Sequence, residues 1–280
     1  MLQSVNMAQF LSVFTRGLKD PLCYLVFLFG VVAIFAPVLS THSPVEPNMS
    51  EKLEAPSLRH FFGTDTYGMD IFSRTLYATR TDFSAAMLAV LLGASIGVPL
   101  GIVSGYVGGP IDDALNYMSE VIQSFPQILF AMGVLAVVGN NIVNLILVLA
   151  FFVIPGYQKI VRSIVLGLKN SEFVQAARCA GASPVTVIFR HLLPNAVIPL
   201  FGQFSIGCAY AIQTTAGLSF LGFGVKIPHP EWGSMITLGA PHIIFGHWWP
   251  AFFPGVAVFL AVLMLRQISE RVRSNYANIQ

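Results

Sequence analysis

The chain has 280 residues, of which 55% are hydrophobic and only 10% are charged, whereas a soluble domain carries about 25% charged residues. With a mean hydropathy of +0.72, the composition argues against a soluble globular domain and predicts a polytopic membrane protein. The net charge of +2 is too small and too dispersed for a nucleic-acid surface, so no nucleic-acid partner is expected.

The first apolar run extends from Pro21 to about Ser40 and follows Arg16 and Lys19. It is too long for the apolar core of a signal peptide and predicts a retained membrane anchor. The polar residues 41–82 predict a loop outside the bilayer. Five more apolar segments then predict a total of about six transmembrane helices, at Phe83–Val107, Val121–Val138, Asn141–Tyr157, Pro194–Phe220 and Pro250–Leu265.

Basic residues set the expected orientation. Residues 158–191 hold five Lys or Arg side chains against the single acidic residue Glu172. The positive-inside rule places this segment in the cytoplasm. With six spans both termini lie on the same side. The turn with Asp112 and Asp113 falls there too, although it has no Lys or Arg of its own.

The apolar segments lack the groups that ion-driven pumps bury. No Asp, Glu, Lys or Arg occurs in residues 83–111, 121–158 or 191–225, so the energy source is expected on another chain. The phosphate-loop pattern, the HExxH pattern and a recognisable Ser/His/Asp set are also absent. We therefore expect a protein that is not an enzyme. Its three cysteines have no paired spacing and are expected to be free, namely Cys23, Cys179 and Cys208.

The basic segment contains signals for two short helices. Asn170 or Ser171 is a candidate N-cap before Glu172, and Gly181 is a candidate helix stop. Ser183-Pro184 then predicts a second helix that ends at Pro194.

Several side chains of this pair are suited to docking. The small Ala176-Ala177 pair would let another surface approach closely, and the expected contacts are Phe173, Val174, Ile188 and Arg178. The alternative is that the pair is an ordinary basic cytoplasmic loop without a docking role.

The spacing of this segment resembles a known motif. Gln175-Ala176-Ala177, then Gly181, then His191-Leu192-Leu193-Pro194 resembles the EAA loop of permease subunits of bacterial ABC importers. In that family the loop inserts into a cleft on the ATP-hydrolysing subunit, and the resemblance implies this role for residues 172–194. The Glu of the family pattern is replaced here by Gln175, so an ionic contact at that position is not expected.

The resemblance extends over residues 61–273. The matching motifs look like the second, C-type permease of the peptide/nickel branch: Phe62-Gly63-Thr64-Asp65, Gly68, Asp70, Ser73-Arg74, Gly108-Gly109 with Asp112, Phe125-Pro126, Leu218 to Gly222, Glu231-Trp232-Gly233 and Pro254-Gly255. Departures from the branch pattern occur at Met69, Tyr117, Glu120, Thr215 and Arg266. The Ala216-Gly217 pair and Ala78-Thr79-Arg80 are more similar to nickel permeases.

The resemblance implies an all-α, MetI-like permease fold in a bacterial cytoplasmic membrane. Residues 1–81 would form the N-terminal segment, first span and outer loop. Residues 82–280 would form a five-helix core with a coupling loop at about 163–194. The implied partners are a second permease, two ATPase subunits and an extracytoplasmic solute-binding protein. ATP and magnesium would bind to the ATPases, and no cofactor is expected on this chain.

Several alternatives stay open from the sequence alone. A secondary transporter or a channel would work without an ATPase. Nickel, a metal chelate and a short peptide are all possible solutes. Asp65, Asp70 and Arg74 either contact the binding protein or hold the outer loop together, and the second role is favoured. Gly68 belongs to the same extracytoplasmic motif. Gly101, Gly105, Gly108 and Gly109 either permit close helix packing or line a pore. Five histidines are expected on the outer side: His42, His60, His229, His242 and His247. A transient metal relay is one interpretation, but their spacings match no compact ligand set, and no metal site is expected.

Overall fold

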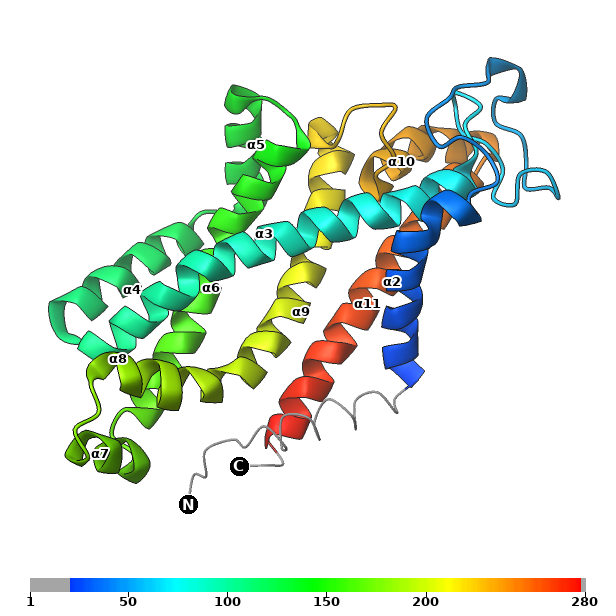
Figure 1. Cartoon of the computed structure of the whole chain (residues 1–280). Helices are drawn as coiled ribbons and strands as arrows, with labels where there is room; N and C mark the ends of the chain where they lie inside the picture. Colours follow the sequence, from blue (N-terminus) through cyan, green and yellow to red (C-terminus); the bar gives the residue numbers. More distant parts are fainter. Residues whose placement is uncertain (1–20, 278–280) are drawn as a thin grey trace.

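The computed structural model describes residues 21–277, with side chains described from residue 29 to residue 274. Within this range every regular element is a helix (Figure 1), which confirms the expected all-helical membrane fold. The expected N-terminal cytoplasmic segment and the side chain of Cys23 lie outside the described residues.

Long apolar helices account for the expected membrane spans. Four stretches of the described chain are long and apolar enough to cross a bilayer: Ile71–Val107, Ile142–Leu168, Pro184–Phe223 and Trp249–Ser274. They contain the helices α3 (Ile71–Val107), α6 (Ile142–Leu168), α9 (Leu193–Leu218) and most of α11 (Trp249–Ala277). The bent pair α4 (Gly109–Ser124) and α5 (Gln127–Val138) makes a fifth. Helix α2 (Pro21–Leu39) lies at the place of the expected first span.

The bend between α4 and α5 differs from the single straight span expected at Val121–Val138. The two helices meet at 82°. Phe125 between them is extended, with φ −79° and ψ 132°, a conformation that the following proline favours. The apolar segment is therefore broken into two helices at Phe125-Pro126.

Helix α3 begins earlier than the sequence indicated. Asp70 caps it by accepting a hydrogen bond from the backbone N–H of Ser73 at 2.8 Å. Residues 71–82, expected to be loop, are therefore helical, and the expected division between residues 81 and 82 falls inside α3. At about 1.5 Å per residue its 37 residues reach roughly 55 Å. The helix is much longer than the hydrocarbon core of a bilayer.

A stripe of glycines brings α3 against α6. A Cβ atom at Gly97 would lie 2.6 Å from the carbonyl oxygen of Ile154, and one at Gly101 would lie 2.6 Å from that of Gln158. The same holds at Gly105, where the carbonyl oxygen of Arg162 would be 2.9 Å away. Small residues at four-residue spacing allow such close approach. Gly101 and Gly105 therefore serve packing.

Gly108 and Gly109 have a different role. They form the turn between α3 and α4, with φ +73° and +61°.

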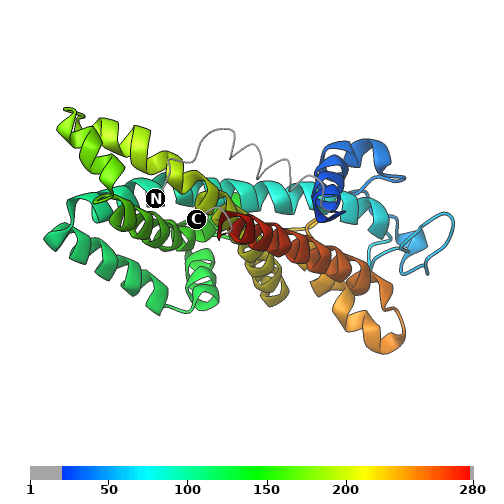
Figure 2. The same cartoon turned by 90° about the horizontal axis from the view of Figure 1, so that it is seen from below.

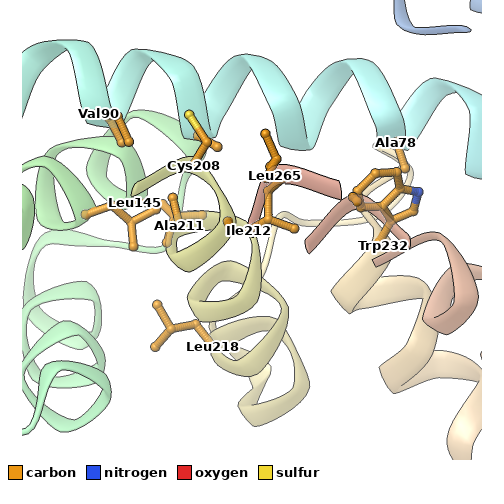
Figure 3. Close-up of a cluster of buried hydrophobic side chains, with 14 of the residues drawn as sticks. Ala78, Val90, Leu145, Cys208, Ala211, Ile212, Leu218, Trp232 and Leu265 are labelled. Carbon is orange, nitrogen blue, oxygen red and sulfur yellow. The ribbon is translucent and has the colours of Figure 1, made fainter. Parts of the chain in front are cut away.

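The largest hydrophobic core joins α3, α6, α9 and α11 (Figure 3). Cys208 and Ile212 on α9 lie there beside Val90 and Leu145. At its edge lies the fully buried Trp232, whose indole N–H donates to the carbonyl oxygen of Thr75 at 3.1 Å. Cys208 is buried, and both described cysteines are free.

An ion pair fixes the α3–α4 turn to α6. The Arg162 guanidinium donates through Nε and Nη2 to the two carboxylate oxygens of Asp112, each at 2.6 Å. Ser104 and Asn116 donate to the same carboxylate, and Lys169 donates to the carbonyl oxygen of Gly105 at 2.9 Å. The acidic turn thus obtains its basic partner from α6.

The molecule has two distinct ends. Helices α7 (Glu172–Cys179) and α8 (Pro184–Val187) lie at one end, next to the α3–α4 turn. Helix α10 (Trp232–Gly239) and the loop of residues 40–70, with its short helix η1 (Met49–Glu51), lie at the other (Figures 1 and 2). The end with α7 and α8 carries the predicted docking segment.

Candidate functional site

Helix α7 is a short, amphipathic element that begins at Glu172. Ser171 takes the extended N-cap conformation, with φ −67° and ψ 152°. Its hydroxyl, however, donates to the carbonyl oxygen of Leu168 at 2.6 Å instead of capping α7. Glu172 lies in the first turn and Arg178 in the last, which places each charge favourably on the helix dipole.

Gly181 ends α7 in a Schellman motif. The N–H of Ala182 donates to the carbonyl oxygen of Ala177, and that of Gly181 donates to the carbonyl oxygen of Arg178, both at 3.0 Å. This six-to-one and five-to-two pattern requires a left-handed residue, and Gly181 has φ +84°. A Cβ atom there would meet nothing within 4 Å. Glycine is therefore needed for its backbone conformation alone.

The second helix does not end where it was expected to. Ser183 caps it by accepting the N–H of Thr186 at 3.2 Å, and Pro184 occupies the first turn. Helix α8 then continues through a π-turn, η2 (Ile188–Leu192), directly into α9. The wider turn comes just before Pro194, where an ordinary helix would lose a hydrogen bond. Residues 184–218 therefore form one continuous helical stretch, followed by the π-turn η3 (Ser219–Phe223), in which Gly222 has a non-helical φ of +91°.

A small hydrophobic cluster holds this helix pair against the rest of the chain. Val174 and Val187 are completely buried, together with Val161, Val165 and Leu192. Phe173 and Ile188 are half-buried and pack on the same cluster. The expectation that Val174 is a docking contact is therefore wrong, because its side chain is completely buried. Phe173 and Ile188 keep part of their surface exposed, and their docking role stays a prediction.

Other side chains form the exposed surface of the pair. Val185 is 63% exposed and Phe189 is 64% exposed, on successive turns of the second helix. Ala176 and Pro194 are also exposed, whereas Ala177 and Leu193 are partly covered. The imidazole of His191 is partly buried, 6.4 Å from the ring centre of Phe173. The sequence analysis missed Val185 and Phe189, whose only signal was their apolar character on a solvent-facing helix.

Two polar side chains of α7 make contacts within this chain. Arg178 places its guanidinium 5.6 Å from the ring centre of Tyr106 on α3. The amide of Gln175 donates to the carbonyl oxygen of Asn170 at 2.8 Å. A glutamate at this position would have no N–H to donate. Gln175 thus joins α7 to the residues just before it by a hydrogen bond.

The geometry describes a rigid projection rather than a reactive site. Both helices of the pair pack on the hydrophobic cluster, and the second helix is continuous with α9. It presents small and apolar side chains to solvent. This arrangement is suited to binding a protein surface.

Comparison with known proteins identifies the family. The model of the "Binding-protein-dependent transport system inner membrane component" matches residues 97–274. This chain belongs to that family. It is 36% identical to a dipeptide transport system permease protein of Alkalihalophilus pseudofirmus, over 88% of this chain and 80% of that one. It is 40% identical to a glutathione transport system permease protein of Shigella flexneri, over 89% and 82% respectively.

A solved structure supports the fold of the permease. The chain is similar to one from inward-facing conformations of the MetNI methionine ABC transporter, with a TM-score of 0.60 and 18% identity. The match covers 73% of the permease and 97% of that chain. The expected MetI-like fold is confirmed, and the chain is a permease subunit of an ABC importer.

The second group of predicted site residues lies at the opposite end of the permease. Asp65 Oδ1 accepts the backbone N–H groups of Tyr67 and Met69 at 2.8 and 3.0 Å. Its Oδ2 lies 3.5 Å from Nε of Arg74, which is completely buried. Burial raises the pKa of Asp65, and the charge of Arg74 opposes that rise.

Arg74 also binds two distant backbone segments. Its Nη1 donates to the carbonyl oxygens of Pro44 at 2.6 Å and Pro228 at 3.0 Å. At Gly68 the φ is +71°, and a Cβ atom would overlap the carbonyl oxygen of Asn48. Through these contacts Arg74 and Gly68 hold the loop of residues 40–70 in its fold.

Two departures from the branch pattern have local partners. Met69 is buried, and its sulfur lies 3.0 Å from Nη1 of Arg74. Arg266 places its guanidinium 5.3 Å from the ring centre of Tyr210. Nothing in the structure explains Tyr117, which is 69% exposed.

Proposed function

We propose that this permease forms one half of a translocation pathway and receives the movement of an ATPase through α7 and α8. The observation that carries the proposal is the helical connection from Pro184 through η2 to Leu218 at the end of α9. A docking surface that is part of a membrane-spanning helix transmits displacement without an intervening flexible joint. The resemblance of residues 172–194 to the EAA loop supports the same role.

The partners follow from this proposal. Two ATPase subunits bind ATP and magnesium and perform the hydrolysis. A second permease completes the pathway, and an extracytoplasmic binding protein delivers the solute. This chain contributes no catalytic group. The exposed Val185 and Phe189 side chains contact the ATPase.

The proposed orientation puts α7 and α8 in the cytoplasm. Residues 158–191 carry the excess of basic side chains, which retains this end on the inner side of the cytoplasmic membrane. Both termini share that side, and the loop of residues 40–70 faces outward to the binding protein.

The mechanism is alternating access. ATP binding draws the ATPases together, and each carries its docked helix pair with it. Coupling requires different interaction free energies between the pair and the open and closed ATPase states. The movement of α9 then changes the side from which the pathway is open.

Short peptides are the proposed solute. The support is that the relatives described above are named for dipeptide and glutathione transport. The residues that are similar to nickel permeases, at Ala216-Gly217 and 78–80, are too few to outweigh whole-chain similarity at 36–40% identity.

Reconstitution tests this function. The complete transporter with its binding protein, in proteoliposomes, is expected to accumulate a labelled dipeptide or glutathione only when ATP is present. Solute flux without ATP would contradict the ABC mechanism. Accumulation of nickel or a metal chelate, with no uptake of any peptide tested, would overturn the proposed solute class.

A further inference from the structure

Three potential metal ligands meet at the end of the permease opposite α7. His42 follows helix α2, His60 lies in the loop before α3, and Asp70 is the N-cap of α3. Asp70 Oδ1 lies 2.9 Å from Nδ1 of His60 and 3.9 Å from Nδ1 of His42. One ligand atom from each residue lies within 4.8 Å of the other two.

These separations suit a single small cation. Ligand atoms about 2.1 Å from one tetrahedral metal lie roughly 3.4 Å apart, and the two distances to Asp70 lie on either side of this value. Two imidazoles and one carboxylate are the donors of many zinc sites. Imidazole also binds nickel and copper well. A bound ion would replace the proton shared by His60 and Asp70.

A fourth residue, Glu51, lies beside the ring nitrogen of His60 that faces away from Asp70. Nε2 of His60, a residue only 1% exposed, has no hydrogen-bond partner within the described part of the chain. It lies 3.4 Å from the carboxylate of Glu51, which Arg59 holds at 2.5 Å. When Nδ1 of such a histidine binds a metal, Nε2 carries the proton and faces a carboxylate. Glu51 occupies that outer position.

The remaining contacts orient the ligands and leave an entry path. Oδ2 of Asp70 accepts the N–H of Ser73 at 2.8 Å, which fixes the carboxylate. The side chain of His42 is 34% exposed, so the site opens to solvent there. Three protein ligands leave one tetrahedral position for water. Such a site exchanges its ion with solution more readily than a closed four-ligand site.

We propose that His42, His60 and Asp70 bind a divalent late transition-metal ion, zinc or nickel, with Glu51 as the outer-shell partner of His60. The ion joins the end of α2, the loop and the start of α3. This proposal is independent of the transported solute, because the site lies in the loop and is tested by direct binding.

The test uses the complete transporter, purified in detergent with an affinity tag that contains no histidine. Zinc binding is measured by equilibrium dialysis, and cobalt is added as a spectroscopic probe of coordination geometry. The His42→Ala transporter is compared with wild type, because the His42 side chain is partly exposed and its removal is expected to leave the fold intact, which thermal unfolding checks. His229→Ala is the matched control, since His229 is exposed and outside the cluster.

The expected result is one zinc ion more per wild-type chain than per His42→Ala chain, with the His229→Ala transporter equal to wild type. Cobalt should give intense visible absorption typical of tetrahedral coordination only where His42 is present. Glu51→Gln should weaken zinc binding about 10- to 100-fold. Equal zinc binding by wild type and a folded His42→Ala transporter, or none by wild type, would overturn the proposal.

Discussion

Gly181 provides the sharpest test of the docking role, because a substitution there should affect docking much more than folding. With φ +84° and nothing within 4 Å of a Cβ atom, Gly181→Asp introduces no clash. The left-handed conformation costs an L-residue about 1–2 kcal/mol. That is small beside the roughly 5–15 kcal/mol that stabilises a folded domain. The variant should therefore fold and insert into the membrane.

Docking should respond more strongly than folding. An unpaired charge buried in an interface costs about 3–5 kcal/mol, which weakens association roughly 100-fold or more. We therefore expect Gly181→Asp to reduce both recovery of the ATPase subunits with the permease and ATP-dependent uptake by at least tenfold. Membrane content of the permease, measured by immunoblotting, should stay near the wild-type level.

Gly246 offers a matched control. It has φ +90°, nothing within 4 Å of a Cβ atom, and solvent exposure, but it lies at the end of η4 (Ala240–Phe245), at the opposite end of the molecule. Gly246→Asp should retain its ATPase subunits. Normal uptake by Gly181→Asp would refute the docking role, and equal ATPase loss in both variants would show that backbone strain is the cause.

Three further predictions concern packing, the ion pair and the exposed surface. Gly101→Ala should lower the free energy of unfolding by about 1–3 kcal/mol, because its Cβ atom would lie 2.6 Å from a backbone oxygen of α6. The control Gly167→Ala meets no atom within 4 Å and should be neutral or slightly stabilising. Equal shifts of the two variants in thermal unfolding in detergent would contradict this prediction. Arg162→Met and Asp112→Asn should each cost about 1–3 kcal/mol, and the double variant should cost less than their sum; strict additivity would argue against the pair. Phe189→Ala should leave thermal unfolding unchanged but reduce ATPase recovery, while Tyr117→Ala, equally exposed, should change neither; unchanged recovery with Phe189→Ala would count against that contact.

The sequence alone predicts the helical class and most of the span positions, because long uncharged apolar runs have few alternatives in a bilayer. It also predicts the helix stop at Gly181 and the restart at Ser183-Pro184, since both depend on local backbone preferences. The π-turn at Ile188–Leu192 has no comparable local signal. From the sequence, Pro194 predicts the end of the second helix, whereas in the structure α8 continues through this turn into α9.

Features that depend on distant partners could not be predicted. The segment with Arg74 and Asp82 looks like loop, but both side chains are buried because Pro44, Pro228 and Trp232 supply their partners from far along the chain. In the same way, His42, His60 and Asp70 have no characteristic spacing. The fold of the loop around the start of α3 brings them together.

The central claim is that the end formed by α7 and α8 contacts an ATPase, and site-specific photocrosslinking tests it most directly. A photoreactive amino acid replaces Phe189 in one permease and Leu58, 95% exposed in the loop at the opposite end, in another. After illumination of intact cells, the account predicts ATPase peptides joined to position 189 and none joined to position 58. Crosslinks from position 189 to no ATPase, or equal ATPase crosslinks from both positions, would contradict it.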